Sequence, residues 1–183
     1  MSSKYQIKDS QQLHFITMST VQWVDALSPP FYKNIIVDSL NYCQKTKGLL
    51  LYAYVIMNNH IHIIASAHEG YTLSDIIRDF KKHTSKQLIL AIQENPEESR
   101  KNWMLWIFSS AGKHNSNNKE YQFWQQDNHP IELSSNQMID QRLDYIHQNP
   151  VKAGIVYEPE HYVYSSASDY SGFKGMVKIS LIS

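Results

Sequence analysis

The sequence contains a single cysteine, Cys43, so it cannot form an internal disulfide, and this composition is typical of a reducing cytosol. It also lacks a long apolar segment, because the longest apolar run, LLLYAYVIM at 49–57, is far shorter than the roughly 20 residues needed to cross a bilayer. The first residues, MSSKYQIKDSQQ, are polar and lack the apolar core of a secretion signal. These absences predict a soluble, cytoplasmic protein with no membrane segment.

The sequence also lacks an excess of charge of either sign, since 17 Lys and Arg residues balance 17 Asp and Glu residues. A strongly basic domain is the usual mark of a protein that coats duplex DNA, so this balance argues against that class while leaving a local basic groove open. Apolar residues make up 42% of the chain, which is enough for a hydrophobic core. Length and composition predict one domain over residues 1–183.

The periodicity of apolar residues predicts alternating strands and helices. The expected elements, in order, are strand 13–24, helix 31–48, strands 49–57 and 60–67, helix 72–95, strand 121–133 and a last helix that starts at 134 or 135 and ends or bends at Pro150. Asn58 and Asn59 tolerate positive φ and predict a hairpin between the second and third strands. This order is that of a ferredoxin-like α+β domain, an antiparallel sheet with two helices on one face, followed here by an additional C-terminal helix.

Three segments fall outside this pattern. The polar lead-in covers about residues 1–12, and the segment at about 109–120 has almost no apolar content, which predicts a mobile loop. The tail at about 157–183 is rich in tyrosine and serine, and its sequence predicts no regular structure.

Two histidines lie inside the third predicted strand, within YVIMNNHIHIIASA at 54–67. Side chains alternate along a strand, so His60 and His62 share one face, with Cα atoms roughly 6.5 Å apart, while Ile61 and Ile63 point into the helix-covered core. Two neutral imidazoles on one face are suited to binding a divalent cation. Such pairs also arise by chance as ordinary strand histidines, and a catalytic metal site needs a third protein ligand with open positions beside it.

The last predicted helix offers that ligand, in DYIHQNP at 144–150. Tyr145 and Asn149 are four residues apart and therefore lie on one helical face, whereas His147 points elsewhere. Tyrosine can act as a covalent nucleophile, and an asparagine oxygen is a hard ligand for Mg²⁺ or Mn²⁺. The chain has 12 tyrosines, most of which serve packing, so Tyr145 can equally be an anchor of the helix. The residues alone leave both interpretations open.

Together, VIMNNHIHII at 55–64 and YIHQNPVKAGIV at 145–156 resemble the motifs of the single-tyrosine HUH transposases, and of REP-associated tyrosine transposases in particular. The resemblance covers most of the chain and includes DIIRDFKKHTSK at 75–86 and FWQQD at 123–127. Either motif alone is weak, whereas the two in this order and at this separation are specific. The chain departs from the family at Asn58, where many members carry proline, and in its near-zero net charge.

The resemblance implies that His60, His62 and Asn149 bind Mg²⁺ or Mn²⁺ and that Tyr145, on a C-terminal catalytic helix, is the nucleophile. The implied activity is metal-dependent nicking and rejoining of single-stranded DNA through a covalent 5′-phosphotyrosine intermediate. The implied partner is a hairpin-containing single strand. The oligomeric state is left open between a monomer and a homodimer.

DNA contacts are expected from a basic patch on the long helix, in RDFKKHTSK at 78–86. The patch would neutralise phosphates, although a solvated helix face is the more usual role of such a run. Its basic residues are Arg78, Lys81, Lys82, His83 and Lys86. Base stacking is expected from aromatic side chains, with core packing favoured for the first of them: Trp124, Tyr162 and Tyr164.

Two other functions are compatible with these residues. A metal-dependent hydrolase would activate water with the histidine pair and needs a nearby carboxylate, the nearest acid in sequence being Glu69. A non-catalytic single-stranded nucleic-acid-binding module would instead use Tyr52 and Tyr54 as stacking platforms. A covalent protein–DNA adduct would exclude both alternatives.

Overall fold

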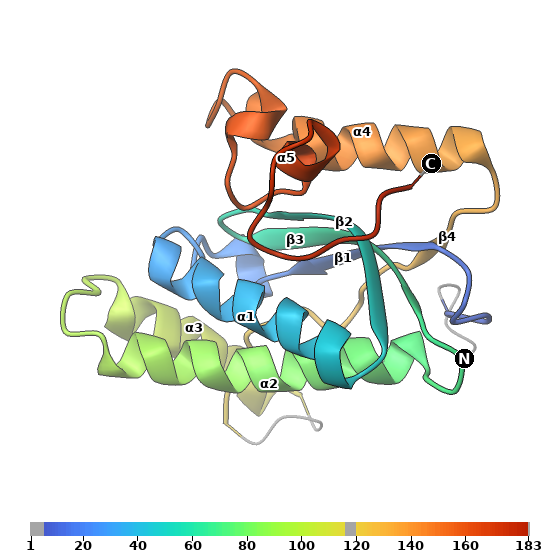
Figure 1. Ribbon diagram of the computed structural model, residues 1–183. Helices are drawn as coiled ribbons and strands as arrows, with labels where there is room; N and C mark the ends of the chain where they lie inside the picture. The colour runs from blue at the N-terminus through green and yellow to red at the C-terminus, as the bar shows by residue number, and fades with distance from the viewer. Residues whose placement is uncertain (1–5, 116–119, 183) are drawn as a thin grey trace.

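The computed structural model describes residues 6–115 and 120–182 (Figure 1). One antiparallel sheet has the strand order β2-β3-β1-β4. Its strands are β1 His14–Ser19, β2 Leu49–Ile56, β3 His60–Ala67 and β4 Ile131–Glu132. The helices are α1 Pro30–Thr46, α2 Leu73–Glu94, α3 Lys101–Lys113, α4 Asn136–Lys152 and α5 Ala167–Tyr170, with short 3-10 turns at Val21–Trp23 and Pro159–His161.

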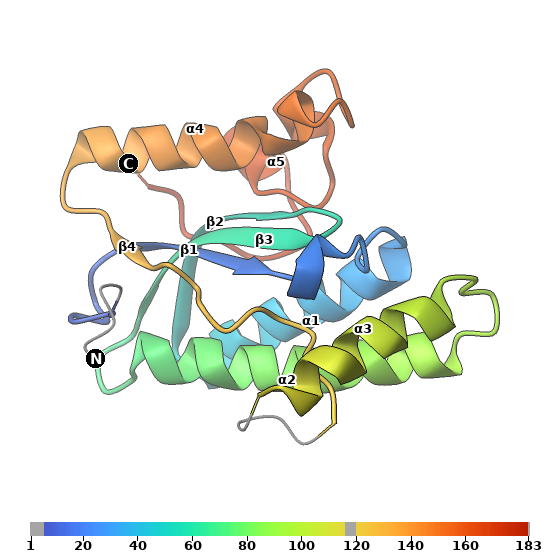
Figure 2. The same cartoon turned by 180° about the vertical axis from the view of Figure 1, so that it is seen from behind.

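The helices form layers on both faces of the sheet. α1, α2 and α3 lie on one side, and α4 and α5 lie on the other, as both views show (Figures 1 and 2). With α3 inserted between α2 and β4, the order β1-α1-β2-β3-α2-β4 and the strand arrangement confirm the predicted ferredoxin-like fold with an additional C-terminal helix.

The core forms where the predicted apolar faces meet. Ile61 and Ile63 on β3 are fully buried, as strand alternation predicted. The apolar stripe of α2 is buried at 73, 76, 77, 80, 84, 88 and 92, which is the helical spacing expected from the sequence. α1 begins with Pro30 at its first position, where the missing N–H costs no helical hydrogen bond.

Several predicted boundaries are wrong. The predicted loop at 109–120 begins inside α3, because Met104, Ile107 and Phe108 at helical spacing bury one face of a helix that continues to Lys113. Residues 116–119 of that loop lie outside the described residues, as do residues 1–5 of the lead-in. The strand predicted at 13–24 ends at Ser19, where the chain turns into Val21–Trp23.

The two late elements also differ from expectation. The strand predicted at 121–133 is reduced to β4 and an isolated bridge at Trp124. α4 continues past Pro150 and ends at Lys152, so Pro150 lies in its last turn.

The tail, for which the sequence predicted no regular structure, runs along the outer edge of β2. The Ile56 N–H donates to the Tyr164 carbonyl, and the Ser166 N–H donates to the Tyr54 carbonyl, both at 2.9 Å. An uncovered edge strand invites pairing with other chains, so this tail protects β2. No helix among the described residues has both the length and the apolar character needed to span a membrane.

Candidate active site between β3 and α4

Four predicted residues meet where α4 crosses the sheet. The ring centroids of His60 and His62 lie 4.7 Å apart, and the ring of Tyr145 lies 5.2 Å from that of His62. The Asn149 side chain lies close enough to the His60 ring to influence its pKa. The structure therefore brings the two histidines, the tyrosine and the asparagine together within one chain.

Local sequence explains this placement. Strand alternation turns both histidines toward α4, while the neighbouring isoleucines face α1 and α2. α4 begins at a cap, where the Ser135 hydroxyl accepts from the Met138 N–H at 3.3 Å. Ile146 is fully buried beneath the helix, and the Tyr145 ring packs edge-on against Phe15 of β1, with centroids 5.9 Å apart. Tyr145 keeps 37% of its surface exposed, so the residue is partly open to solvent.

Hydrogen bonds fix both imidazole rings through Nδ1. Nδ1 of His62 lies 2.8 Å from the Thr17 hydroxyl, and Nδ1 of His60 lies 2.7 Å from Oδ1 of Asn59. The Asn59 amide nitrogen donates to the Trp23 carbonyl and to Asp25, which places its oxygen toward His60. An amide oxygen only accepts, so His60 donates from Nδ1 and keeps a lone pair on Nε2.

These atoms fit a divalent cation. Two Nε2 atoms and an amide oxygen would supply three protein ligands and leave further positions open, as catalytic sites do. Among the described residues, no three His, Cys, Asp or Glu side chains are grouped so that they could hold a metal ion, so a third ligand beside this pair would be of another type, such as Asn149. Outer hydrogen bonds of this kind commonly orient metal-binding histidines.

The electrostatics of the site favour neutral imidazoles, which is the form that binds metal. Burial lowers the pKa of His62 to about 3, with further lowering by His60 and by Arg142. Burial also lowers the pKa of His60, and the nearby Asn149 side chain opposes this effect. Both rings are therefore uncharged at neutral pH.

The sequence from residue 10 to residue 116 matches the family model described as "Transposase IS200 like". The chain belongs to the IS200-like transposase family. The match includes both histidines and ends before α4, so Tyr145 and Asn149 lie outside it.

Solved structures extend the similarity to the whole chain. A REP-associated tyrosine transposase bound to a REP hairpin has a TM-score of 0.66 and 16% identity, covering 100% of this chain and 94% of that one. A Deinococcus radiodurans protein described as a transposase has a TM-score of 0.46 and 15% identity, covering 79% of this chain and 95% of that one. The first similarity covers the whole of this chain, so the two proteins share one fold, including the region of α4. No curated protein sequence matches the chain significantly.

Two cations at the site of the transposase were missed by sequence reasoning. The Arg142 guanidinium lies 4.8 Å from the centre of the Phe15 ring, and the Lys152 ammonium lies 5.9 Å from the centre of the Tyr145 ring. Positions 142, 145, 149 and 152 are spaced by three, four and three residues, which places them on one face of α4. This spacing is visible in the sequence and indicates that Arg142 and Lys152 share a helical face with Tyr145.

The basic patch predicted to bind DNA lies elsewhere on the transposase. It belongs to α2, on the opposite face of the sheet from Tyr145 (Figures 1 and 2). Arg78 pairs with Asp75 and Asp79. Lys82 and Lys86 are exposed, as is His83.

Lys81 is held by the protein. Its ammonium donates to the carbonyls of Gln125 and Gln126, at 2.6 and 3.2 Å, and to Oδ1 of Asn128 at 2.7 Å. Burial lowers the pKa of Lys81 to about 8, and the charge of Asp127 opposes this effect. These contacts give Lys81 a structural role in holding the segment 125–128.

The aromatic residues proposed to stack on bases are buried. Trp124 donates from its indole nitrogen to the Thr84 hydroxyl at 2.9 Å, and Tyr162 and Tyr164 pack in the core beside β2. Tyr54, the platform proposed for a binding module, is fully buried. His147 points away from the site, as predicted, and hydrogen-bonds the Ser166 hydroxyl at 3.0 Å.

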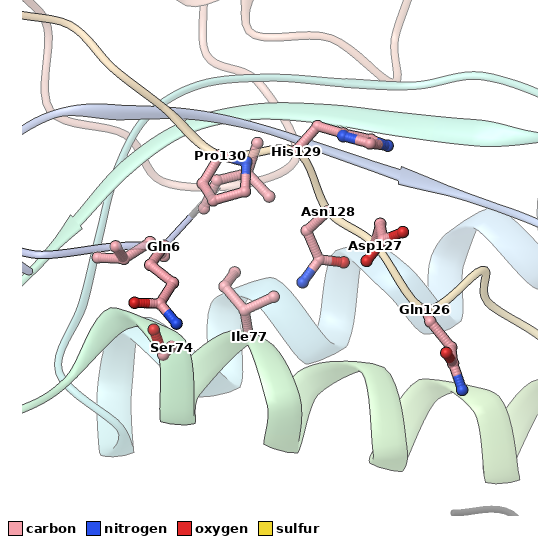
Figure 3. Close-up of a pocket in the computed structure, with 10 residues that line it drawn as sticks. Gln6, Ser74, Ile77, Gln126, Asp127, Asn128, His129 and Pro130 are labelled. Carbon is pink, nitrogen blue, oxygen red and sulfur yellow. The ribbon is translucent and has the colours of Figure 1, made fainter. Parts of the chain in front are cut away.

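A cavity of about 570 Å³ lies on the α2 side of the sheet. Figure 3 shows its lining, from Gln6, from Ser74 and Ile77 of α2, and from the segment 126–130. Neither histidine of the candidate site nor Tyr145 lines it.

Proposed function

We propose that this transposase nicks and rejoins single-stranded DNA with Tyr145 as the nucleophile, using Mg²⁺ or Mn²⁺ held by His60, His62 and Asn149. The observation that carries the proposal is the 5.2 Å separation of the Tyr145 and His62 ring centroids in one chain, with the Asn149 side chain beside His60. One chain supplies all four residues, so a homodimer is not required for a complete site.

Nicking begins when the Tyr145 oxygen attacks the scissile phosphorus in line with the leaving 3′-oxygen. An oxygen–phosphorus bond forms to Tyr145, the bond from phosphorus to the 3′-oxygen breaks, and that oxygen gains a proton to leave as a hydroxyl. The phenolic proton leaves to water at this exposed site. The 5′-phosphate stays on Tyr145, and attack by another 3′-hydroxyl reverses the step without an external energy source.

A bound metal would supply Lewis-acid polarisation of a non-bridging phosphate oxygen. The protein orients its ligands beforehand, through the hydrogen bonds at Nδ1 of each histidine. Arg142 and Lys152 flank Tyr145 on α4 and would neutralise charge on the phosphate as the phosphotyrosine forms.

A hairpin-containing single strand is the proposed substrate, supported by the solved transposase of the same fold that is bound to a REP hairpin. Lys82 and Lys86 are exposed on α2 and are proposed as phosphate contacts of the DNA away from the scissile bond. Arg78, in contact with two carboxylates, and Lys81, held by main-chain oxygens, are less available for that role.

Covalent capture tests the proposal. The protein is incubated with a pool of hairpin-flanked single strands, labelled at the 3′ end because that fragment would stay on the tyrosine. With Mg²⁺ or Mn²⁺ we expect an adduct on denaturing gels, which is lost in Tyr145→Phe and on addition of EDTA, while Tyr145→Phe still binds the DNA. Tyr157→Phe is the matched control, because Tyr157 is 96% exposed and should leave the adduct unchanged.

Each alternative gives a different result. An undiminished adduct in Tyr145→Phe would contradict the role of this tyrosine. Metal-dependent strand cleavage without any adduct would indicate a hydrolase, and metal-independent binding without cleavage would indicate a binding module.

A further inference from the structure

Trp23 lies beside the candidate active site with its indole open to solvent. Its side chain is 56% exposed, although large aromatic residues usually bury most of their surface. The centres of the Trp23 and His60 rings lie 6.0 Å apart, at an interplanar angle of 68°. The exposed indole therefore borders one of the two proposed metal-binding histidines.

The backbone that presents this indole is strained. Gln22 and Trp23 have φ values of 53° and 54°, in the left-handed region that residues other than glycine rarely adopt. Such conformations persist only where surrounding contacts hold them, and they gather at ligand-binding positions.

Contacts on both sides hold the segment in place. The Val21 N–H donates to the Phe123 carbonyl at 2.8 Å, and the Asn59 amide donates to the Trp23 carbonyl at 3.3 Å. Arg100 donates to the Asp25 carbonyl at 3.0 Å. Asn59 also accepts from His60, so one side chain positions both the indole-bearing turn and the histidine. The backbone that carries the indole is thus held before any ligand arrives, which reduces the entropy lost on binding.

We propose that Trp23 is a stacking platform for the DNA base attached to a nucleotide beside the scissile phosphate. The proposal rests on the proposed function, since it takes the phosphate to lie at the histidine pair. A base one nucleotide from that phosphate reaches an indole that borders His60. Indole stacking on bases tolerates different sequences, which suits a platform that holds a single strand in place rather than reading it.

The stacking prediction is tested by removing the indole and the base separately and together. Trp23→Asn removes the ring and tolerates the left-handed backbone, and Trp23→Phe keeps a smaller ring. Oligonucleotides derived from the captured substrate carry one abasic nucleotide at each position around the scissile bond. Affinity is measured by fluorescence anisotropy, so the result does not depend on cleavage, and the adduct rate is measured in parallel.

We expect Trp23→Asn to weaken binding of the intact strand by roughly tenfold, in line with the loss of one stacked base, and Trp23→Phe to weaken it less. At one position beside the scissile phosphate, the abasic strand should bind the wild type and Trp23→Asn equally. Mn²⁺ affinity should be unchanged, which separates stacking from damage to the metal site. Trp106→Ala is the control, because Trp106 is also exposed but lies on α3, and its effect should not depend on any abasic position.

Additive losses at every abasic position, or unchanged binding by Trp23→Asn, would overturn the inference. If the wild type forms no adduct with any strand, the proposed function fails. The anisotropy cycle is then run on a hairpin-flanked strand from the unselected pool, with one abasic nucleotide at each position in turn, and it still decides whether Trp23 stacks on a base.

Discussion

The Thr17 hydroxyl lies 2.8 Å from Nδ1 of His62, and the two residues are direct partners across β1 and β3. His60 is held in the same manner by Asn59, the residue before it in the chain. Each proposed metal-binding ring thus has its Nδ1 engaged by the protein, which leaves Nε2 as the nitrogen available to a cation.

Thr17→Val should weaken metal binding, because it removes the hydroxyl at nearly constant volume and lets the His62 ring turn. Removal of such an outer hydrogen bond typically costs 10- to 100-fold in metal affinity, so we expect roughly tenfold weaker Mn²⁺ binding in calorimetry. Thr17→Ser should restore it. Thr46→Val, at an exposed threonine on α1, is the matched control. Equal Mn²⁺ affinity in Thr17→Val and the wild type would show that the hydroxyl does not orient the ring.

Arg142→Gln and Lys152→Gln should slow adduct formation, because each removes a cation that flanks Tyr145. We expect roughly a tenfold lower single-turnover rate for each variant, and a salt dependence of DNA binding that falls by about one ion for each cation removed. Lys45→Gln changes a charge on α1, across the sheet, and should match the wild type. Rates that do not depend on either α4 cation would remove them from the site.

The geometry within each element of the site was predictable from the sequence. Strand alternation placed His60 and His62 on one face, and a spacing of four placed Tyr145 and Asn149 on one face. Both relationships depend only on the local backbone, so a sequence pattern is enough to define them.

Contacts between elements were not predictable. Thr17 reaches His62 across 45 residues of sequence, and this pairing depends on the register of β1 against β3. The left-handed turn at Trp23 is held by Asn59 and Phe123, which are distant in the sequence, so no local sequence pattern predicts it. The run of lysines on α2 suggested one shared role. In the structure, however, Lys81 packs against the segment 125–128, whereas Lys82 is exposed, and the sequence of α2 does not distinguish the two.

Lys81→Met should destabilise the fold, because it leaves the partly buried Gln125 carbonyl and the Asn128 side chain without their ammonium donor. We expect a decrease in the free energy of unfolding of about 1–3 kcal/mol in urea titrations. Lys82→Met is the matched control for stability, since exposed substitutions usually stay within about 0.5 kcal/mol. If Lys81→Met instead reduced the salt dependence of DNA binding without loss of stability, Lys81 would contact phosphate.

Ser166→Ala should loosen the attachment of α4, which carries Tyr145, to the sheet. The Ser166 hydroxyl lies 3.0 Å from both the Tyr54 N–H and Nε2 of His147, so it links the edge of β2 to α4. Its loss leaves two buried polar groups without this partner, and we expect the free energy of unfolding to fall by about 1–3 kcal/mol. Because His147 lies two residues from Tyr145, the adduct rate should also fall at temperatures where the variant is fully folded. Ser171→Ala, at an exposed position just after α5, is the control and should alter neither quantity. A destabilised Ser166→Ala with an unchanged adduct rate would mean that Phe15 and Ile146 alone position the tyrosine.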